Sequence, residues 1–154
     1  MSGGRRGRCA NLTPVAAPRY ELVPRPPNVE DYLELRRRAG LSPKTPQQAS
    51  AALPGSWAAC HAVREGGARA VAMGRLIGDG GWYFHVIDMA VLPDYQRRGL
   101  GSLVLGFLLE QIRSRAPEGA YVSLLADPPG RRLYERHGFV ESAPTSVGMV
   151  LRLS

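Results

Sequence analysis

The sequence predicts a single α/β domain built on a mixed, mostly antiparallel sheet flanked by helices. Its 154 residues are a common length for one domain and are enough to bury a core without disulfides or metals. Three apolar strand candidates between residues 57 and 92 are separated by short glycine-rich turns, which is typical of an antiparallel meander. After residue 101 the pattern changes to helix, strand, helix and strand, which predicts helices packed on that sheet.

The first third of the chain predicts a tail, a strand and two helices. Residues 1–18 are rich in Gly, Arg, Pro and Ala without periodicity, so we expect a disordered tail before a single domain over 19–154. Asn28 is a favourable helix N-cap, and Thr45 followed by Pro46 opens a second helix. The elements expected here are a strand over 20–23, a helix from 28 to Gly40 and a short helix within 41–54.

The rest of the chain predicts strands and helices from two different periodicities. Apolar residues between 102 and 115 recur at helical spacing, whereas those between 147 and 153 alternate as in a strand. The expected elements are strands over 57–64, 68–77, 82–92 and 121–126, helices over 102–115 and 130–137, a strand beginning at Phe139, and a last strand over 147–153.

Composition and charge exclude several classes of protein. Cys9 and Cys60 match no metal-ligand spacing, so we expect no metal and a reduced, cytoplasmic setting. No apolar run approaches the ~20 residues of a bilayer span, and no apolar segment follows the N-terminal arginines, so we expect neither a membrane partner nor a secretory leader. Residues 1–25 carry +4 of the formal net charge of +7, which leaves a mildly basic body that suits a small polyanion better than a nucleic acid.

The segment after the third strand predicts an anion-binding loop. A strand ends at Pro93, a loop containing Gly99 and Gly101 follows, and an apolar helix begins at once. The first turn of a helix leaves four backbone N–H groups without partners, and glycine lets an anion approach the backbone. A P-loop is excluded because Ser102, not lysine, follows Gly101, and a dinucleotide fingerprint is excluded by Val104.

Two motifs together resemble a known family. Gln-x-x-Gly-x-Gly occupies residues 96–101, and Tyr134, in the run Leu-Tyr-Glu-Arg-His-Gly-Phe, follows Gly101 by 33 residues. This pair resembles the GNAT superfamily of N-acetyltransferases, and the likeness is good over residues 82–139. The resemblance implies a GNAT-like sheet with splayed central strands, acetyl-CoA as cofactor and CoA as product.

The resemblance also implies which residues hold acetyl-CoA. Backbone amides of the loop would bind the pyrophosphate, and Met89 and Val91 would offer main-chain hydrogen bonds to the pantetheine arm in the splayed gap. Asp127 and Gly130 stand where family members often have Asn and Ala, so the pantetheine contact of Asp127 differs from the family pattern. The expected cofactor-binding residues are Met89, Ala90, Val91, Gln96, Arg97, Arg98, Gly99, Leu100, Gly101, Ser102, Asp127, Arg131, Tyr134 and Arg136, with Arg132 as a further phosphate partner.

Two residues are candidates for moving protons. In the family the tyrosine at the position of Tyr134 is the acid that protonates the leaving thiolate, which a phenol with a pKa of ~10 can do. His85 is the candidate base, because alternation places residues 85, 87, 89 and 91 on one face of a strand that runs into the loop. The expected alternatives are His61 as a distant second base, His137 as a partner of a helix dipole, and Asp88 as a structural residue pointing the other way.

The acceptor site is expected between residues 30–53 and the loop after Phe139. Tyr32, Leu41, Tyr83 and Trp57 would supply apolar surface there, which favours a small alkyl or arylalkyl amine acetylated by direct transfer in a ternary complex. The alternatives are a protein N-terminus or lysine as acceptor, or a non-catalytic acyl-CoA-binding regulatory module. We expect the protein to be a monomer or a homodimer.

Overall fold

A computed structural model describes residues 19–153, and the expectation of a tail over 1–18 lies outside this range. The strands are β1 (Tyr20–Val23), β2 (Ala58–Arg64), β3 (Ala70–Gly78), β4 (Tyr83–Val91) and β5 (Tyr121–Ser123). The helices are α1 (Val29–Arg38), α2 (Pro46–Ala52), α3 (Leu100–Arg115) and α4 (Arg131–Arg136), and the short 3-10 turns are η1 (Leu53–Gly55), η2 (Pro93–Tyr95) and η3 (Pro128–Gly130).

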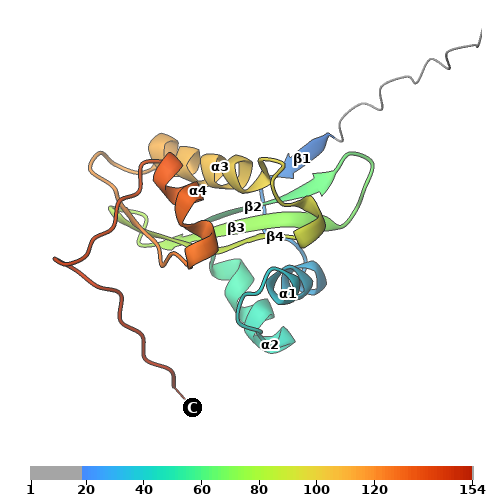
Figure 1. The fold of residues 1–154 in the computed structure, drawn as a ribbon, viewed down its shortest axis with the longest axis horizontal. Coiled ribbons are helices and arrows are strands. Elements are labelled where there is room, and N and C mark those ends of the chain that lie inside the picture. The colour runs from blue at the N-terminus through green and yellow to red at the C-terminus, as the bar shows by residue number, and fades with distance from the viewer. Residues whose placement is uncertain (1–18, 154) are drawn as a thin grey trace, which may run out of the picture.

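The five strands form one sheet in the order β1-β2-β3-β4-β5. The pairs from β1 to β4 are antiparallel, and β4 and β5 are parallel. Helix α3 covers one face of the sheet, and α1 and α2 cover the other (Figure 1). The predicted mixed, mostly antiparallel sheet flanked by helices is therefore confirmed.

Close packing between the sheet and α3 depends on a glycine in β3. A Cβ at position 74 would lie 2.6 Å from the Met89 sulfur and 2.7 Å from a methyl carbon of Val104. Fully buried side chains such as Phe84 and Leu108 complete this layer of the core. Because the interior is close-packed, α3 can lie this near to β3 only where a side chain is missing.

Both N-terminal helices begin as the sequence predicts. The Asn28 side chain accepts a hydrogen bond from the Asp31 amide at 2.8 Å. Thr45 and Gln48 form a reciprocal capping box at the start of α2. These caps fix where each helix begins and so place the loop between them, which borders the site described below.

The strands expected from Phe139 and over 147–153 are wrong. Residues 140–153 form no strand and run away from the body of the domain (Figure 1). Met149 and Leu151, two of the alternating apolar side chains, are more than four-fifths exposed. Alternation specifies which face of a strand is apolar but supplies no neighbouring strand, and β5 itself ends at Ser123 rather than at residue 126.

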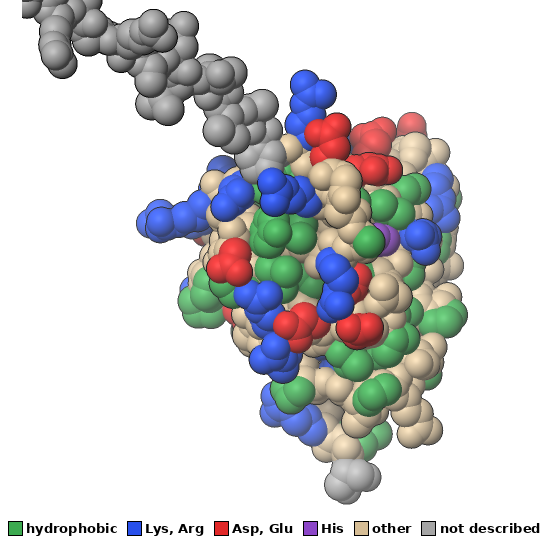
Figure 2. All heavy atoms as spheres, turned by 90° about the vertical axis from the view of Figure 1, so that its right-hand side faces the viewer, with side chains coloured by type: hydrophobic (Ala, Val, Ile, Leu, Met, Phe, Trp, Pro, Cys, Tyr) green, Lys and Arg blue, Asp and Glu red, His purple; other side chains and the backbone are tan. Residues whose placement is uncertain are grey.

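Charges of both signs mix on the face shown in Figure 2. Surface ion pairs join α1 to the loop before β3 and to η2, with N–O distances of 3.0 Å for Arg69–Glu30 and for Arg38–Asp94. This intermixing agrees with the weak net charge of the body.

Within residues 19–153, no helix combines the length and the hydrophobicity that a bilayer span requires.

Candidate functional site

A cavity of about 1130 Å³ opens beside the carboxyl-terminal half of β4. Its walls come from segments that are far apart in the sequence: residues 39–41, residues 85–91 of β4, the loop from Tyr95 into α3, and residues of the segment 125–136 that includes α4. This cavity brings the predicted anion-binding loop, the predicted base and the predicted acid together.

The cavity exists because β4 and β5 separate. Their parallel pairing runs from Tyr83 with Tyr121 to His85 with Ser123, whereas β4 continues to Val91. The Leu92 amide donates to the Val71 carbonyl at 2.9 Å, so the preceding residue, Val91, presents its N–H and C=O on the opposite side. The Val91 carbonyl accepts a hydrogen bond from the side-chain nitrogen Nε2 of Gln96 at 3.1 Å. The edge of β4 is thus open to a ligand, with one carbonyl already partnered.

A β-bulge interrupts β4 at Asp88. Met73 pairs with Ala90 and Arg75 pairs with Ile87, so Asp88 and Met89 together face the single residue between them on β3. Asp88 adopts a left-handed backbone conformation with a φ of 58°. Such a conformation is uncommon outside glycine, and Asp tolerates it better than most residues.

The bulge overturns the expectation that residues 85, 87, 89 and 91 share a face. Ile87 pairs with Arg75, whose side chain points toward α1 and η1, so His85 and Ile87 face that side. Met89 packs toward α3, and Val91 lies beside the first turn of α3. One extra residue in the strand reverses the alternation, which a strict period of two cannot represent.

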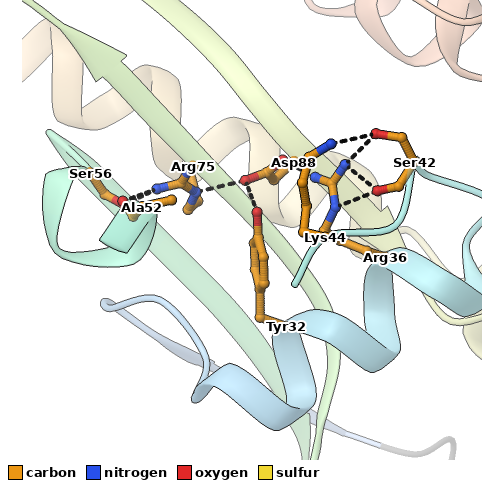
Figure 3. Close-up of polar contacts among 8 residues, drawn as sticks. All are labelled: Tyr32, Arg36, Ser42, Lys44, Ala52, Ser56, Arg75 and Asp88. Carbon is orange, nitrogen blue, oxygen red and sulfur yellow. Dashed lines mark hydrogen bonds and ion pairs between the residues drawn. The ribbon is translucent and has the colours of Figure 1, made fainter. Parts of the chain in front are cut away.

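A buried ionic cluster holds the bulge in place (Figure 3). Both the Tyr32 hydroxyl and the Arg75 Nε donate to Asp88 Oδ2 at 2.8 Å, and Arg36 pairs with Asp88 Oδ1. Arg75 also donates to the Ala52 carbonyl and the Ser56 hydroxyl, each at 2.8 Å. Asp88 therefore faces α1, on the same side of the sheet as His85, and the expectation that it points the other way is wrong. Two guanidinium groups and a phenol converge on its carboxylate, which agrees with a structural role.

The same cluster fixes the loop between α1 and α2. Arg36 donates from Nε and Nη2 to the Ser42 carbonyl at 2.9 and 2.7 Å. Ser42 follows residues 39–41, which line the cavity, and Leu41 lies there as expected. Tyr32 does not line the cavity, because its ring is 3% exposed and its hydroxyl is bound to Asp88. Tyr32 therefore contacts the cluster behind the cavity wall rather than the cavity itself.

The loop before α3 has the backbone form of an anion site. Arg97 has a φ of 60° and Gly99, the N-cap of α3, a φ of 80°. The helix that follows has 16 residues, and its first amides open toward the cavity lined by Gly99, Gly101 and Ser102. Gly101 allows α4 to approach, since a Cβ there would lie 3.1 Å from a Leu133 methyl group.

The arginines expected around a cofactor separate into two groups. Arg97, Arg132 and Arg136 line the cavity. Arg98 instead lies 5.6 Å from the centre of the Tyr95 ring and donates to the Tyr20 hydroxyl at 3.3 Å, and Arg131 does not line the cavity.

Tyr134 lies in α4 and lines the cavity. Burial, with a smaller contribution from the Asp127 carboxylate, raises the pKa of its hydroxyl above the ordinary value. Its ring contacts Gly130, where a Cβ would come within 3.0 Å of a ring carbon. The glycine that departs from the family pattern therefore makes room for the tyrosine ring.

The three histidines have different environments. His85 lines the cavity, its Nδ1 lies 2.8 Å from the Ser123 hydroxyl, and burial lowers its pKa below the ordinary value. His61, the expected second base, is buried in β2 beside the Arg25 carbonyl and does not line the cavity. His137 caps the end of α4, and its Nε2 lies 2.6 Å from the Ser102 hydroxyl.

Two aromatic residues expected at the acceptor site lie elsewhere. The Tyr83 ring stacks on Tyr121 with centroids 5.6 Å apart, and Tyr83 is not part of the cavity wall. Trp57 packs against Phe84 and beneath Arg115, whose guanidinium lies 4.1 Å from the indole centre. The residues expected from the sequence do not include Ser123, because only the pairing of β5 with β4 places it beside His85 and no motif signals that pairing.

The fold and the cavity define a class of protein. A mixed sheet that separates beside a glycine-capped helix N-terminus suits a ligand with a diphosphate and an extended arm, because amides bind the anion and an open strand edge pairs with the arm. A family model described as an acetyltransferase (GNAT) domain matches residues 57–141, more than half of the chain. The chain belongs to this family.

Known proteins resemble the chain over different lengths. A solved structure from meticillin-resistant Staphylococcus aureus, a protein of unknown function described as a probable acetyltransferase, is 38% identical with a TM-score of 0.82, covering 88% of this chain and 100% of that one. An uncharacterized N-acetyltransferase, ycf52, of Pyropia yezoensis is 28% identical over 56% of this chain and 48% of its own length. A ribosomal protein bS18-alanine N-acetyltransferase of Haemophilus influenzae is 34% identical over 36% of this chain and 38% of its own length. The chain thus spans half or less of these curated relatives.

Proposed function

We propose that the protein transfers the acetyl group of acetyl-CoA to a primary amine. The observation that carries this proposal is the single cavity in which the N-terminus of α3, the open edge of β4 and Tyr134 meet. Acetyl-CoA, when bound, supplies an activated thioester carbonyl and a thiol leaving group. Membership of the acetyltransferase family supports the same reaction class.

The residues present suit the two parts of this cofactor. The amides from Arg97 to Ser102, with Arg97, Arg132 and Arg136 around the cavity, provide hydrogen-bond donors and positive charge for a diphosphate. The open edge of β4 provides the Val91 N–H for an amide-bearing arm. The Val91 carbonyl is satisfied by Gln96, so an arm would have to displace that side chain to bind it.

Tyr134 and His85 have the protonation states that acid and base roles require. The raised pKa of Tyr134 keeps the phenol protonated at neutral pH, so its proton is available to a thiolate. The lowered pKa of His85 keeps the imidazole neutral at neutral pH, so it can accept a proton from the amine directly or through water.

The acceptor side favours direct transfer to a small alkyl or arylalkyl amine. Leu41 and Ile87 bring apolar surface to the cavity on the α1 side. Cys60 is not a covalent carrier, since it is fully buried in β2 and burial raises the pKa of its thiol to about 12. An α-amino group of a protein is the second candidate acceptor, favoured by the likeness to the enzyme of H. influenzae that is named for an alanine of a ribosomal protein.

Two measurements test the proposal. Calorimetric titration with CoA is expected to show one site per chain, and release of free thiol from acetyl-CoA is expected with a panel of amines that includes 2-phenylethylamine and an alanine-started peptide. If CoA binds but none of the amines in the panel causes thiol release from acetyl-CoA, the protein is instead a non-catalytic acyl-CoA-binding module. Absence of CoA binding would contradict the proposal as a whole.

A further inference from the structure

The hydroxyl of Ser123 lies where three polar groups converge beside His85. His85 Nδ1 is 2.8 Å from Ser123 Oγ, and the Tyr83 hydroxyl is 3.0 Å from the same oxygen. The Phe84 carbonyl is the third neighbour, at 3.4 Å. All of them meet at the last residue pair of β4 and β5 before the strands separate.

The donor inventory of these groups favours one arrangement. A serine hydroxyl has one proton to donate and two lone pairs to accept with, and the Phe84 carbonyl can only accept. If Ser123 donates to that carbonyl, it accepts from the Tyr83 hydroxyl and from an N–H at His85 Nδ1. In this arrangement the serine proton is used in the contact with the Phe84 carbonyl, whereas a serine that donates to Nδ1 leaves that contact unused.

We infer that Ser123 is a positioning residue that holds neutral His85 as the Nδ1–H tautomer and leaves Nε2 as the proton acceptor. Because Nδ1 is engaged by Ser123 and His85 lines the cavity, Nε2 is the ring nitrogen left for a substrate. This inference rests on the proposed role of His85 as the base, but the tautomer is a property of the free protein.

Tyr83 has a supporting part in this arrangement. Its ring is stacked on Tyr121 at an interplanar angle of 23°, which fixes the direction of its hydroxyl toward Ser123. The two tyrosines are themselves a parallel register pair, two residues before His85 and Ser123 on their strands. Tyr83 was expected to contact the acceptor, but in this arrangement it supports Ser123, which in turn contacts His85.

The tautomer can be measured directly by nitrogen NMR of the full-length protein without ligands. The protein is labelled with 15N and studied about two pH units above the ordinary histidine pKa of ~6.5, and His85 is assigned by comparison with His85→Gln. A protonated Nδ1 with an unprotonated Nε2 is the expected result. A predominant Nε2–H form would overturn the inference even if the protein is an active acetyltransferase.

Variants separate positioning from general structural support. Ser123→Ala is expected to shift His85 toward the other tautomer and to lower kcat for 2-phenylethylamine acetylation about tenfold, with the KM for acetyl-CoA unchanged. Ser123→Thr keeps the hydroxyl and suits a strand, so it is expected to retain both the Nδ1–H tautomer of His85 and the kcat of the unmodified protein. Ser114→Ala is the matched control, because Ser114 is exposed and its hydroxyl bonds only within α3. An unchanged tautomer in Ser123→Ala would refute the inference. If no amine is acetylated, the proposed function fails while the NMR result still decides the tautomer.

Discussion

Replacing Asp88 with Asn tests how much the buried cluster contributes to the fold. The side chains of Arg36, Asp88 and Arg75 are 7%, 3% and 5% exposed, so removing the carboxylate charge leaves two guanidinium groups buried without an anion. Breaking a buried pair in this way costs about 3–5 kcal/mol. Asn tolerates left-handed backbone as Asp does, so the φ of 58° adds no penalty. The loss then reflects the missing charge and the replacement of one acceptor oxygen by an NH2 group that faces other donors.

Chemical denaturation followed by tryptophan fluorescence measures this loss in the free energy of unfolding. In thermal denaturation, a loss of this size corresponds to a fall in Tm of roughly 10 °C for a domain of this length. Asp94→Asn is the matched control, because the Arg38–Asp94 pair has side chains 35% and 76% exposed and is expected to contribute less than about 1 kcal/mol. Equal stabilities of the two variants would refute the assignment of the cluster as the support of the bulge.

Three further substitutions test the site. Tyr134→Phe is expected to lower kcat by about 100-fold or more with little effect on CoA affinity in calorimetry, because the ring still packs and only the acid is lost. His85→Ala is expected to flatten the acidic limb of the rate–pH profile. In the unmodified protein the acidic limb lies below pH ~6.5, because the lowered pKa of His85 keeps its imidazole neutral to lower pH. The basic limb lies above pH ~10, because the pKa of Tyr134 is raised. Gly99→Val is expected to weaken CoA binding at least tenfold, because a β-branched residue strains a φ of 80° and covers the N-terminus of α3. A CoA affinity equal to that of the unmodified protein would show that the loop is not the anion site.

Local chemistry explains why much of the fold was predictable. Caps such as Asn28 and Thr45 act within three or four residues, and glycine turns and apolar periodicity act over a single element. The glycine loop before α3 was predictable for the same reason, since its glycines and the following helix are contiguous. Tyr134 was located by a motif, and the structure brings it into the same cavity as that loop.

The mistaken expectations concern contacts between distant segments. The alternation over residues 85–91 failed because Asp88 is held by Arg36, 52 positions earlier, and by Tyr32, 56 positions earlier. A period of two in the sequence contains no sign of those partners. The strand expected over 147–153 failed in the same way, because a strand needs a neighbour and alternation does not name one.

The bulge links the stability of the core to the geometry of the site. Were β4 regular, Met89 would face the same side as His85, and Asp88 would point toward α3. With the extra residue, His85 and Ile87 line the cavity on the α1 side while Met89 packs beside Gly74. The left-handed conformation at Asp88 costs of order 1 kcal/mol or more, and the three partners of its carboxylate offset that cost. The ionic cluster is therefore the physical reason that one strand can serve a packed core on one face and an open cavity along its edge.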